Sequence, residues 1–215
     1  MIARPRSPRE EEARSEHVNS DERPFTYAPP DTLRAARALL GLTMDEVAEY
    51  IQMSRKSLAG CENGSDATLT SIAALRNFYD KAGIEFLGVY DLTTREFYGS
   101  GVCWKPRTLL GRAALRPLPV DDANFFAARA LLGLSEEQVA RESKLAERQI
   151  ENLENGRRFT AKGYKQLREY FEDEKHMEFL CATMTDARNY LAAGVRIASK
   201  RAPLPSRLWV KPRAG

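Results

Sequence analysis

The chain has 215 residues, of which 43% are hydrophobic and 29% are charged, and its formal net charge is +3. This length suits two small domains, and no apolar run approaches the ~18 residues that a membrane span needs, so we expect a soluble cytoplasmic protein. The 3 cysteines are widely spaced and match no zinc or disulfide pattern. We therefore expect no metal and no cofactor.

The first segment, residues 1–30, is rich in Arg, Glu, Ser and Pro, which predicts a disordered tail. An amphipathic helix is predicted from Thr32, and Gly41 is its expected end. A second helix should begin after Thr43, because Thr43 and Glu46 have the spacing of a capping box.

A third short helix is predicted from Arg55 to Asn63, with Ser54 as a candidate N-cap and Gly64 as its C-cap. A fourth helix should follow from about Leu69. Beyond it, alternating apolar residues predict the two strands of a β-hairpin.

The same pattern then recurs 92 positions later. Residues 36–43 read Ala-Arg-Ala-Leu-Leu-Gly-Leu-Thr, and residues 128–135 differ from them only in a final Ser. Glu-Asn-Gly at 62–64 returns at 154–156. The offset becomes 93 in the hairpins, so one residue is gained after the third helix. A fixed register of this kind predicts a duplicated unit.

Both units resemble the lambda-repressor-like, or Cro/Xre-type, helix-turn-helix domain. The resemblance is carried by the Ala-Arg-Ala-Leu-Leu-Gly-Leu stretch, a Val-Ala pair in the second helix and Glu-Asn-Gly after the third. It implies a mainly α fold with small β-hairpins, in two tandem domains related by pseudo-two-fold symmetry. The expected divisions are domain 1 at 31–104, a basic linker at 105–120, domain 2 at 121–198 and a basic tail at 199–215.

Each hairpin alone would be marginally stable in water. We therefore expect the two hairpins to join in one sheet and to bury their apolar faces together around the pseudo-two-fold axis. The resemblance also implies that an arginine of the first helix pairs with the glutamate that ends the third. By position, these pairs are Arg37 with Glu62 and Arg129 with Glu154.

In this fold the third helix enters the major groove with its N-terminus first. No acid lies beside Arg55 and Lys56 until Glu62, so both should be available to DNA. The residues that the resemblance places at the DNA are Thr43, Ser54, Arg55, Lys56 and Ser57 in the first unit, and Ser135, Glu147, Arg148, Gln149, Asn152, Arg157 and Arg158 in the second.

Some residues depart from the family pattern. The turn residue is usually Gly, but here it is Gln52 or Lys144, at a strain of roughly 1 kcal/mol if the left-handed conformation is kept. Glu136 stands where the family often has a phosphate-contacting Gln, and it would repel a phosphate. Ser143 replaces a core aliphatic residue.

These features predict a sequence-specific DNA-binding regulator, by default a repressor, that reads two non-identical half-sites and is located at the nucleoid. The expected partner is double-stranded DNA, with a homodimer through the hairpins and contact with RNA polymerase as further options. We find no catalytic residues and expect no enzyme. Two alternatives stay open: a protein-interaction adaptor or antiactivator that has lost DNA readout, and an architectural, excisionase-like DNA binder.

Overall fold

The computed structural model describes residues 28–65, 67–91, 93–105, 123–183 and 190–198. The expected N-terminal tail up to residue 27, the linker from 106 and the tail 199–215 lie outside these ranges. The first helix begins at Pro30, two positions before the expected Thr32. Proline suits the first turn of a helix because its missing N–H has no intrahelical partner there.

The first half of the chain folds into four helices within the described residues: α2 (Pro30–Leu40), α3 (Met44–Tyr50), α4 (Arg55–Asn63) and α5 (Leu69–Lys81). The predicted capping box is confirmed, because the Thr43 hydroxyl accepts from the N–H of Glu46 while the Glu46 carboxylate accepts from the N–H of Thr43. Gln52, in the turn between α3 and α4, is left-handed at φ 53°. The strained turn predicted from the sequence is therefore present.

The second half contains α7 (Phe125–Leu132), α8 (Glu136–Ser143), α9 (Glu147–Glu154) and α10 (Ala161–Glu169). The helices α8, α9 and α10 each begin 92 positions after α3, α4 and α5. A short π-helix, η1 (Tyr170–Glu174), then prolongs α10. One extra residue per turn defines a π-helix, so η1 accommodates the residue that changes the offset from 92 to 93.

The four strands form one antiparallel sheet. They are β1 (Ile84–Asp91), β2 (Glu96–Trp104), β3 (Met177–Thr183) and β4 (Tyr190–Ile197), in the order β1-β2-β4-β3. At the centre β2 pairs with β4, with Val102 opposite Val195. The prediction that the two hairpins join in one sheet is confirmed.

The expected burial of the two apolar hairpin faces against each other is wrong. The hairpins meet edge to edge, which satisfies the backbone N–H and C=O groups that β2 and β4 would otherwise expose. Their apolar side chains pack on helices instead. The Phe179 ring lies 5.4 Å from Phe125 of α7, and the Phe86 ring lies 6.3 Å from Tyr79 of α5.

The close approach of β2 and β4 depends on two glycines. Gly101 lies opposite Arg196, and Gly194 lies opposite Cys103. A Cβ at Gly101 would overlap the carbonyl oxygen of Val195, and a Cβ at Gly194 would overlap that of Val102. Any other residue at these two positions would force the strands apart.

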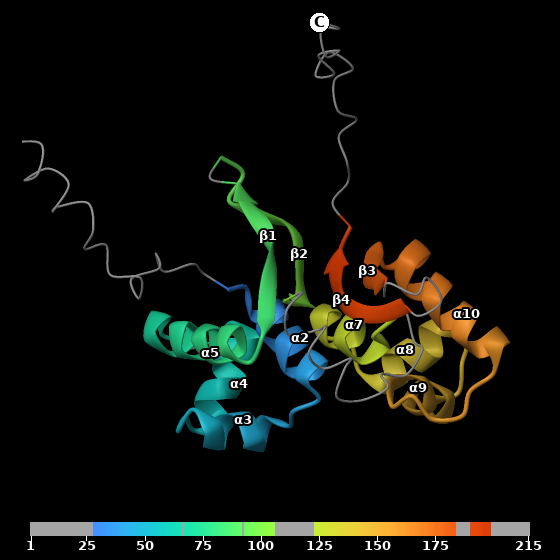
Figure 1. Cartoon of the computed structure of the whole chain (residues 1–215), viewed down its shortest axis with the longest axis horizontal. Coiled ribbons are helices and arrows are strands. Elements are labelled where there is room, and N and C mark those ends of the chain that lie inside the picture. Colours follow the sequence, from blue (N-terminus) through green and yellow to red (C-terminus); the bar gives the residue numbers. More distant parts are fainter. Residues whose placement is uncertain (1–27, 66, 92, 106–122, 184–189, 199–215) are drawn as a thin grey trace, which may run out of the picture.

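Figure 1 shows the sheet on one side of the molecule and α3, α4, α8 and α9 on the other. Helices α2 and α7 pack against each other beneath the junction of β2 and β4, and each also contacts the strand of its own half. The two halves are therefore joined twice, once through the sheet and once through this helix pair. These two contacts place α4 and α9 on the same side of the molecule.

Candidate nucleic-acid interface

The C-terminal end of α4 is held by an ion pair from α2. Arg37 Nε lies 2.7 Å from Glu62 Oε1 and Arg37 Nη2 lies 2.8 Å from Glu62 Oε2, a bidentate contact. The Glu62 side chain is only 3% exposed. The hydrogen bonds that Arg37 donates to Glu62 raise the pKa of Arg37, so the guanidinium stays charged.

An equivalent ion pair holds the end of α9. Arg129 Nε lies 2.6 Å from Glu154 Oε1 and Nη2 lies 2.8 Å from Oε2. Burial opposes the charge on Arg129, but its hydrogen bonds and the charge of Glu154 outweigh burial and raise the pKa of Arg129. Both predicted pairs are therefore present. Glu136, which the sequence predicts to repel a phosphate, lies beside the same arginine, with its carboxylate 3.3 Å from Arg129 Nη2.

At the start of α4 the structure corrects the expectation that Arg55 has no acid beside it. Arg55 Nη1 donates to both carboxylate oxygens of Asp45, at 3.0 and 2.9 Å, across the exposed face between α3 and α4. Lys56 and Ser57 are exposed, as expected. Together with Gly60 and neighbouring residues, they line a surface hollow along α4.

Of the four serine and threonine hydroxyls expected at DNA, three cap helices: those of Thr43, Ser54 and Ser135. Thr43 caps α3 and Ser135 caps α8, each within a capping box. The Ser54 hydroxyl accepts from the N–H of Ser57 at 3.1 Å. These side chains hold the first turns of α3, α8 and α4, and they remain exposed at the surface.

On α9, Glu147, Arg148 and Gln149 are exposed, whereas Asn152 is half-buried. The Gln149 side-chain oxygen accepts from the N–H of Ala146 at 3.0 Å, which leaves its amide N–H₂ as a donor. With Arg158, residues 149 and 152 line a hollow beside the loop that follows α9.

The sequence predicts Arg157 as a phosphate contact. In the structure this arginine has an acidic partner, because its Nη1 lies 2.7 Å from a Glu151 carboxylate oxygen. Arg158, next to it, is exposed and has no ion pair among the described residues.

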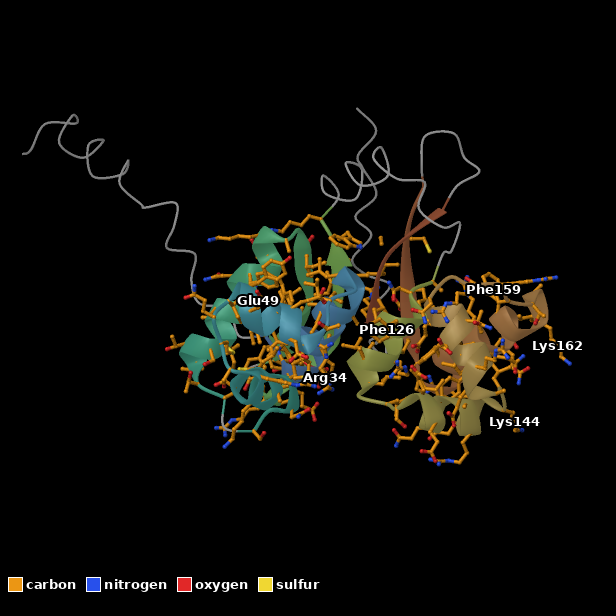
Figure 2. All side chains as sticks on the ribbon, turned by 90° about the horizontal axis from the view of Figure 1, so that it is seen from below. Arg34, Glu49, Phe126, Lys144, Phe159 and Lys162 are labelled. Atoms are coloured by element: carbon orange, nitrogen blue, oxygen red, sulfur yellow. The ribbon has the colours of Figure 1, made fainter. Side chains whose placement is uncertain are left out.

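Sequence reasoning missed Arg34, which connects the two halves. Its Nε donates to the carbonyl oxygen of Ala130 in α7 at 3.1 Å, and its Nη1 donates to the carbonyl oxygen of Glu62 in α4. In Figure 2, Arg34 and Phe126 lie between the halves. The counterpart of Arg34 in the repeat is Phe126, so a comparison of the two units gave no signal for this contact.

None of the helices in the described residues is long and apolar enough to cross a membrane. The described part of the chain brings together no group of three or more His, Cys, Asp or Glu side chains that could hold a metal ion.

Comparison with known proteins identifies the first unit. Residues 33–86 match the family model described as Helix-turn-helix, which is the Cro/C1-type domain. The match runs from α2 into β1 and includes α3, the turn at Gln52 and α4. Domains of this family bind double-stranded DNA through the helix that corresponds to α4. No curated protein and no solved structure matches the chain.

Proposed function

We propose that the chain is a transcriptional regulator with two helix-turn-helix units that bind adjacent half-sites of one DNA duplex. The observation that carries this proposal is the pair of clamped helices. Arg37–Glu62 and Arg129–Glu154 fix α4 and α9 by the same bidentate contact. The second unit thus has the same Arg–Glu ion pair and capping box as the first unit, and its helices begin at equivalent positions. The first unit matches a family that binds DNA.

A single molecule would provide both readers. In ordinary helix-turn-helix dimers, the two recognition helices address half-sites about one helical turn apart. Here β2–β4 pairing and the packing of α2 on α7 take the place of a dimer interface. We propose that the two units are related by a pseudo-two-fold axis through this junction, the product of a tandem duplication.

The half-sites should differ in sequence. Helix α4 offers Arg55, Lys56 and Ser57, whereas α9 offers Glu147, Arg148 and Gln149. Arginine bonds guanine bidentately, glutamine suits adenine and glutamate accepts from cytosine. A non-palindromic operator follows from these differences. We further propose repression by occupancy of a promoter as the mode of regulation, and no enzymatic activity.

Selection of bound duplexes from a random library tests this proposal. We expect one asymmetric consensus, bound by one chain per duplex, with a Kd that rises as salt concentration rises. Fluorescence anisotropy on the selected duplex and on a scrambled one gives the specificity ratio. Recovery of no consensus, with equal weak binding to all duplexes, would exclude sequence-specific regulation.

An adaptor function is favoured by one separate observation. Val89, Tyr90 and Tyr98 are exposed near the tip of the β1–β2 hairpin, on the side of the molecule away from α4 and α9. Exposed apolar groups of this kind suit a protein contact. If substitution of these residues abolished regulation in cells while Arg55→Ala left it unchanged, the adaptor function would replace DNA readout.

A further inference from the structure

We infer that the two units divide the work on DNA: the second unit supplies most of the phosphate contacts, and the first supplies most of the base-specific contact. This inference rests on the proposed function and adds to it. It concerns which part of the duplex each unit contacts, rather than whether the chain binds DNA.

Four cations surround α9. They lie in the turn before α9, in its first turn, in the loop after it and in the first turn of α10. All four are exposed and none forms an ion pair among the described residues. We call this group the basic rim: Lys144, Arg148, Arg158 and Lys162.

The first unit has no such rim. The residues 92 positions earlier are Gln52, Lys56, Asp66 and Thr70. Of these, Asp66 lies outside the described residues, and only Lys56 is a cation. In Figure 2, Lys144 and Lys162 lie at the outer end of the second unit.

The loop that carries Arg158 is anchored by aromatic rings. Phe159 is 40% exposed, and its ring stacks on Tyr164 of α10 at 5.6 Å between centroids. Tyr164 in turn contacts Phe125 of α7 at 5.3 Å. Arg158 therefore lies on a loop that packs against the core. This packing reduces the ordering of the loop that binding requires.

The acids near α9 do not cancel the rim. Glu151 is paired with Arg157 at 2.7 Å, and Glu137 lies 3.8 Å from Arg141. Glu147, at the N-terminus of α9, has no ion pair in the described structure. It lies where base edges are read, and there it would accept from a cytosine amino group rather than approach a phosphate.

Helix α4 is arranged for the opposite task. Asp45 holds Arg55 through Nη1 alone, so Nη2 and Nε keep donors for the two acceptors of guanine. A carboxylate beside the arginine also repels phosphates, which disfavours non-specific contact. The charge pattern thus favours base reading by the first unit and backbone binding by the second.

The test exchanges rim residues for their first-unit counterparts. The double variant Lys144→Gln and Lys162→Thr is compared with the full-length wild type by anisotropy on the selected and the scrambled duplex over a range of KCl. Each phosphate contact contributes about 0.9 to the slope of log K against log [salt]. We expect the slope to become shallower by about 1.8, with the ratio of specific to scrambled affinity unchanged.

Two further variants make the result decisive. Lys81→Gln with Arg95→Gln removes the same charge from the end of α5 and from the β1–β2 turn, away from α9, and should leave the slope near that of the wild type. Arg55→Ala should lower the specificity ratio about tenfold or more and change the slope little. The inference is overturned if the rim variant has the slope of this control, or if Arg55→Ala flattens the slope without lowering the ratio. A wild type that binds neither duplex would instead overturn the proposed function, on which the inference depends.

Discussion

A buried glutamate near the end of α4 and another at the end of α9 each depend on a single arginine. Glu154 is 4% exposed and Arg129 is 14% exposed, so little water can replace the bond between them. Burial raises the pKa of Glu154, and Arg129 offsets this only in part. Loss of one partner would leave the other charged and buried, which is more costly than loss of the whole pair.

We therefore expect Arg129→Met to destabilise the protein by ~3–5 kcal/mol. Thermal unfolding followed by circular dichroism measures the effect as a large fall in Tm. Arg37→Met should act in the same way on the first unit. Arg141→Met is the matched control, because Arg141 is exposed and forms only a 3.8 Å pair with Glu137. Equal melting temperatures for Arg129→Met and Arg141→Met would show that the clamp does not stabilise the fold.

For readout, Arg55→Ala should cost ~1–3 kcal/mol in specific binding and relax the preference at one base position. The reason is that Arg55 is the one arginine of α4, and its planar fork suits the two acceptors of guanine. Selection with the variant measures the base preference directly. Asp45→Ala keeps Arg55 and should keep that preference. If Arg55→Ala and Lys56→Ala both bound the operator like wild type, the first unit would not be a reader.

Among the secondary-structure elements, the β2–β4 contact is the most sensitive to a single methyl group. Gly194 lies against Cys103, whose thiol is half-buried at the junction. Burial, with the nearby charge of Glu85, raises the pKa of Cys103 to about 11. Because the thiolate is the reactive form, the rate at which Cys103 is alkylated shows whether β2 and β4 are paired.

We expect Cys103 to react with iodoacetamide roughly 100-fold more slowly at pH 8 than an exposed thiol, and its rate to rise tenfold per pH unit towards 11. Mass spectrometry of labelled peptides resolves it from the exposed Cys181. Gly194→Ala should separate β4 from β2 and speed labelling of Cys103 at pH 8. Labelling of that variant at the wild-type rate, with an unchanged Tm, would show that the glycine does not maintain the junction.

Local elements were largely predictable from the sequence, because their determinants are local. Capping residues, glycine stops and apolar spacing specify the helices around Thr43 and Ser135, and the repeated register places the clamps. The left-handed Gln52 and Lys144 followed from the family resemblance, because the family usually has Gly at this turn. The existence of one joint sheet followed from the marginal stability of a lone hairpin.

Features that depend on three-dimensional contact were not predictable. The Asp45–Arg55 pair joins residues from two helices whose relative orientation the sequence does not state. The edge-to-edge junction depends on the register between β2 and β4, which lie in different halves of the chain. The bond from Arg34 to Ala130 spans 96 positions and has no counterpart in the repeat. Among the expected DNA residues, Arg157 has a partner that the sequence did not predict, because the loop conformation brings Arg157 to Glu151.

At the scale of the whole molecule, the distance between α4 and α9 is set by the junction of the halves. The sheet fixes one side of this junction through β2 and β4, and α2 on α7 fixes the other. Arg34 is a polar contact that links this junction to α4, because it bonds Ala130 of α7 and the last turn of α4 at once. A Cβ added at Gly133 would lie 3.0 Å from Arg34 Nη2, so the guanidinium packs closely against the backbone at the end of α7.

Arg34→Met should therefore loosen the spacing of α4 and α9 without unfolding either unit. On operators with one or two base pairs inserted between the half-sites, we expect the wild type to lose tenfold or more in affinity, since each 1.4 kcal/mol of misfit is a factor of ten. The variant should lose clearly less, while binding the optimal spacing more weakly. Anisotropy on the spacer series measures both.

Arg34→Lys separates bond geometry from charge. Lysine keeps the positive charge but lacks the planar fork that bonds two carbonyl oxygens at fixed angles, so this variant should resemble Arg34→Met. If Arg34→Lys kept the wild-type spacing preference, charge alone would hold the junction. If both variants kept it, β2–β4 pairing and apolar packing would suffice, and Arg34 would have no part in placing the readers. A fall in overall stability would weaken binding at every spacer length alike. Melting temperatures close to wild type in both variants would therefore show that the change lies in the spacing of the units.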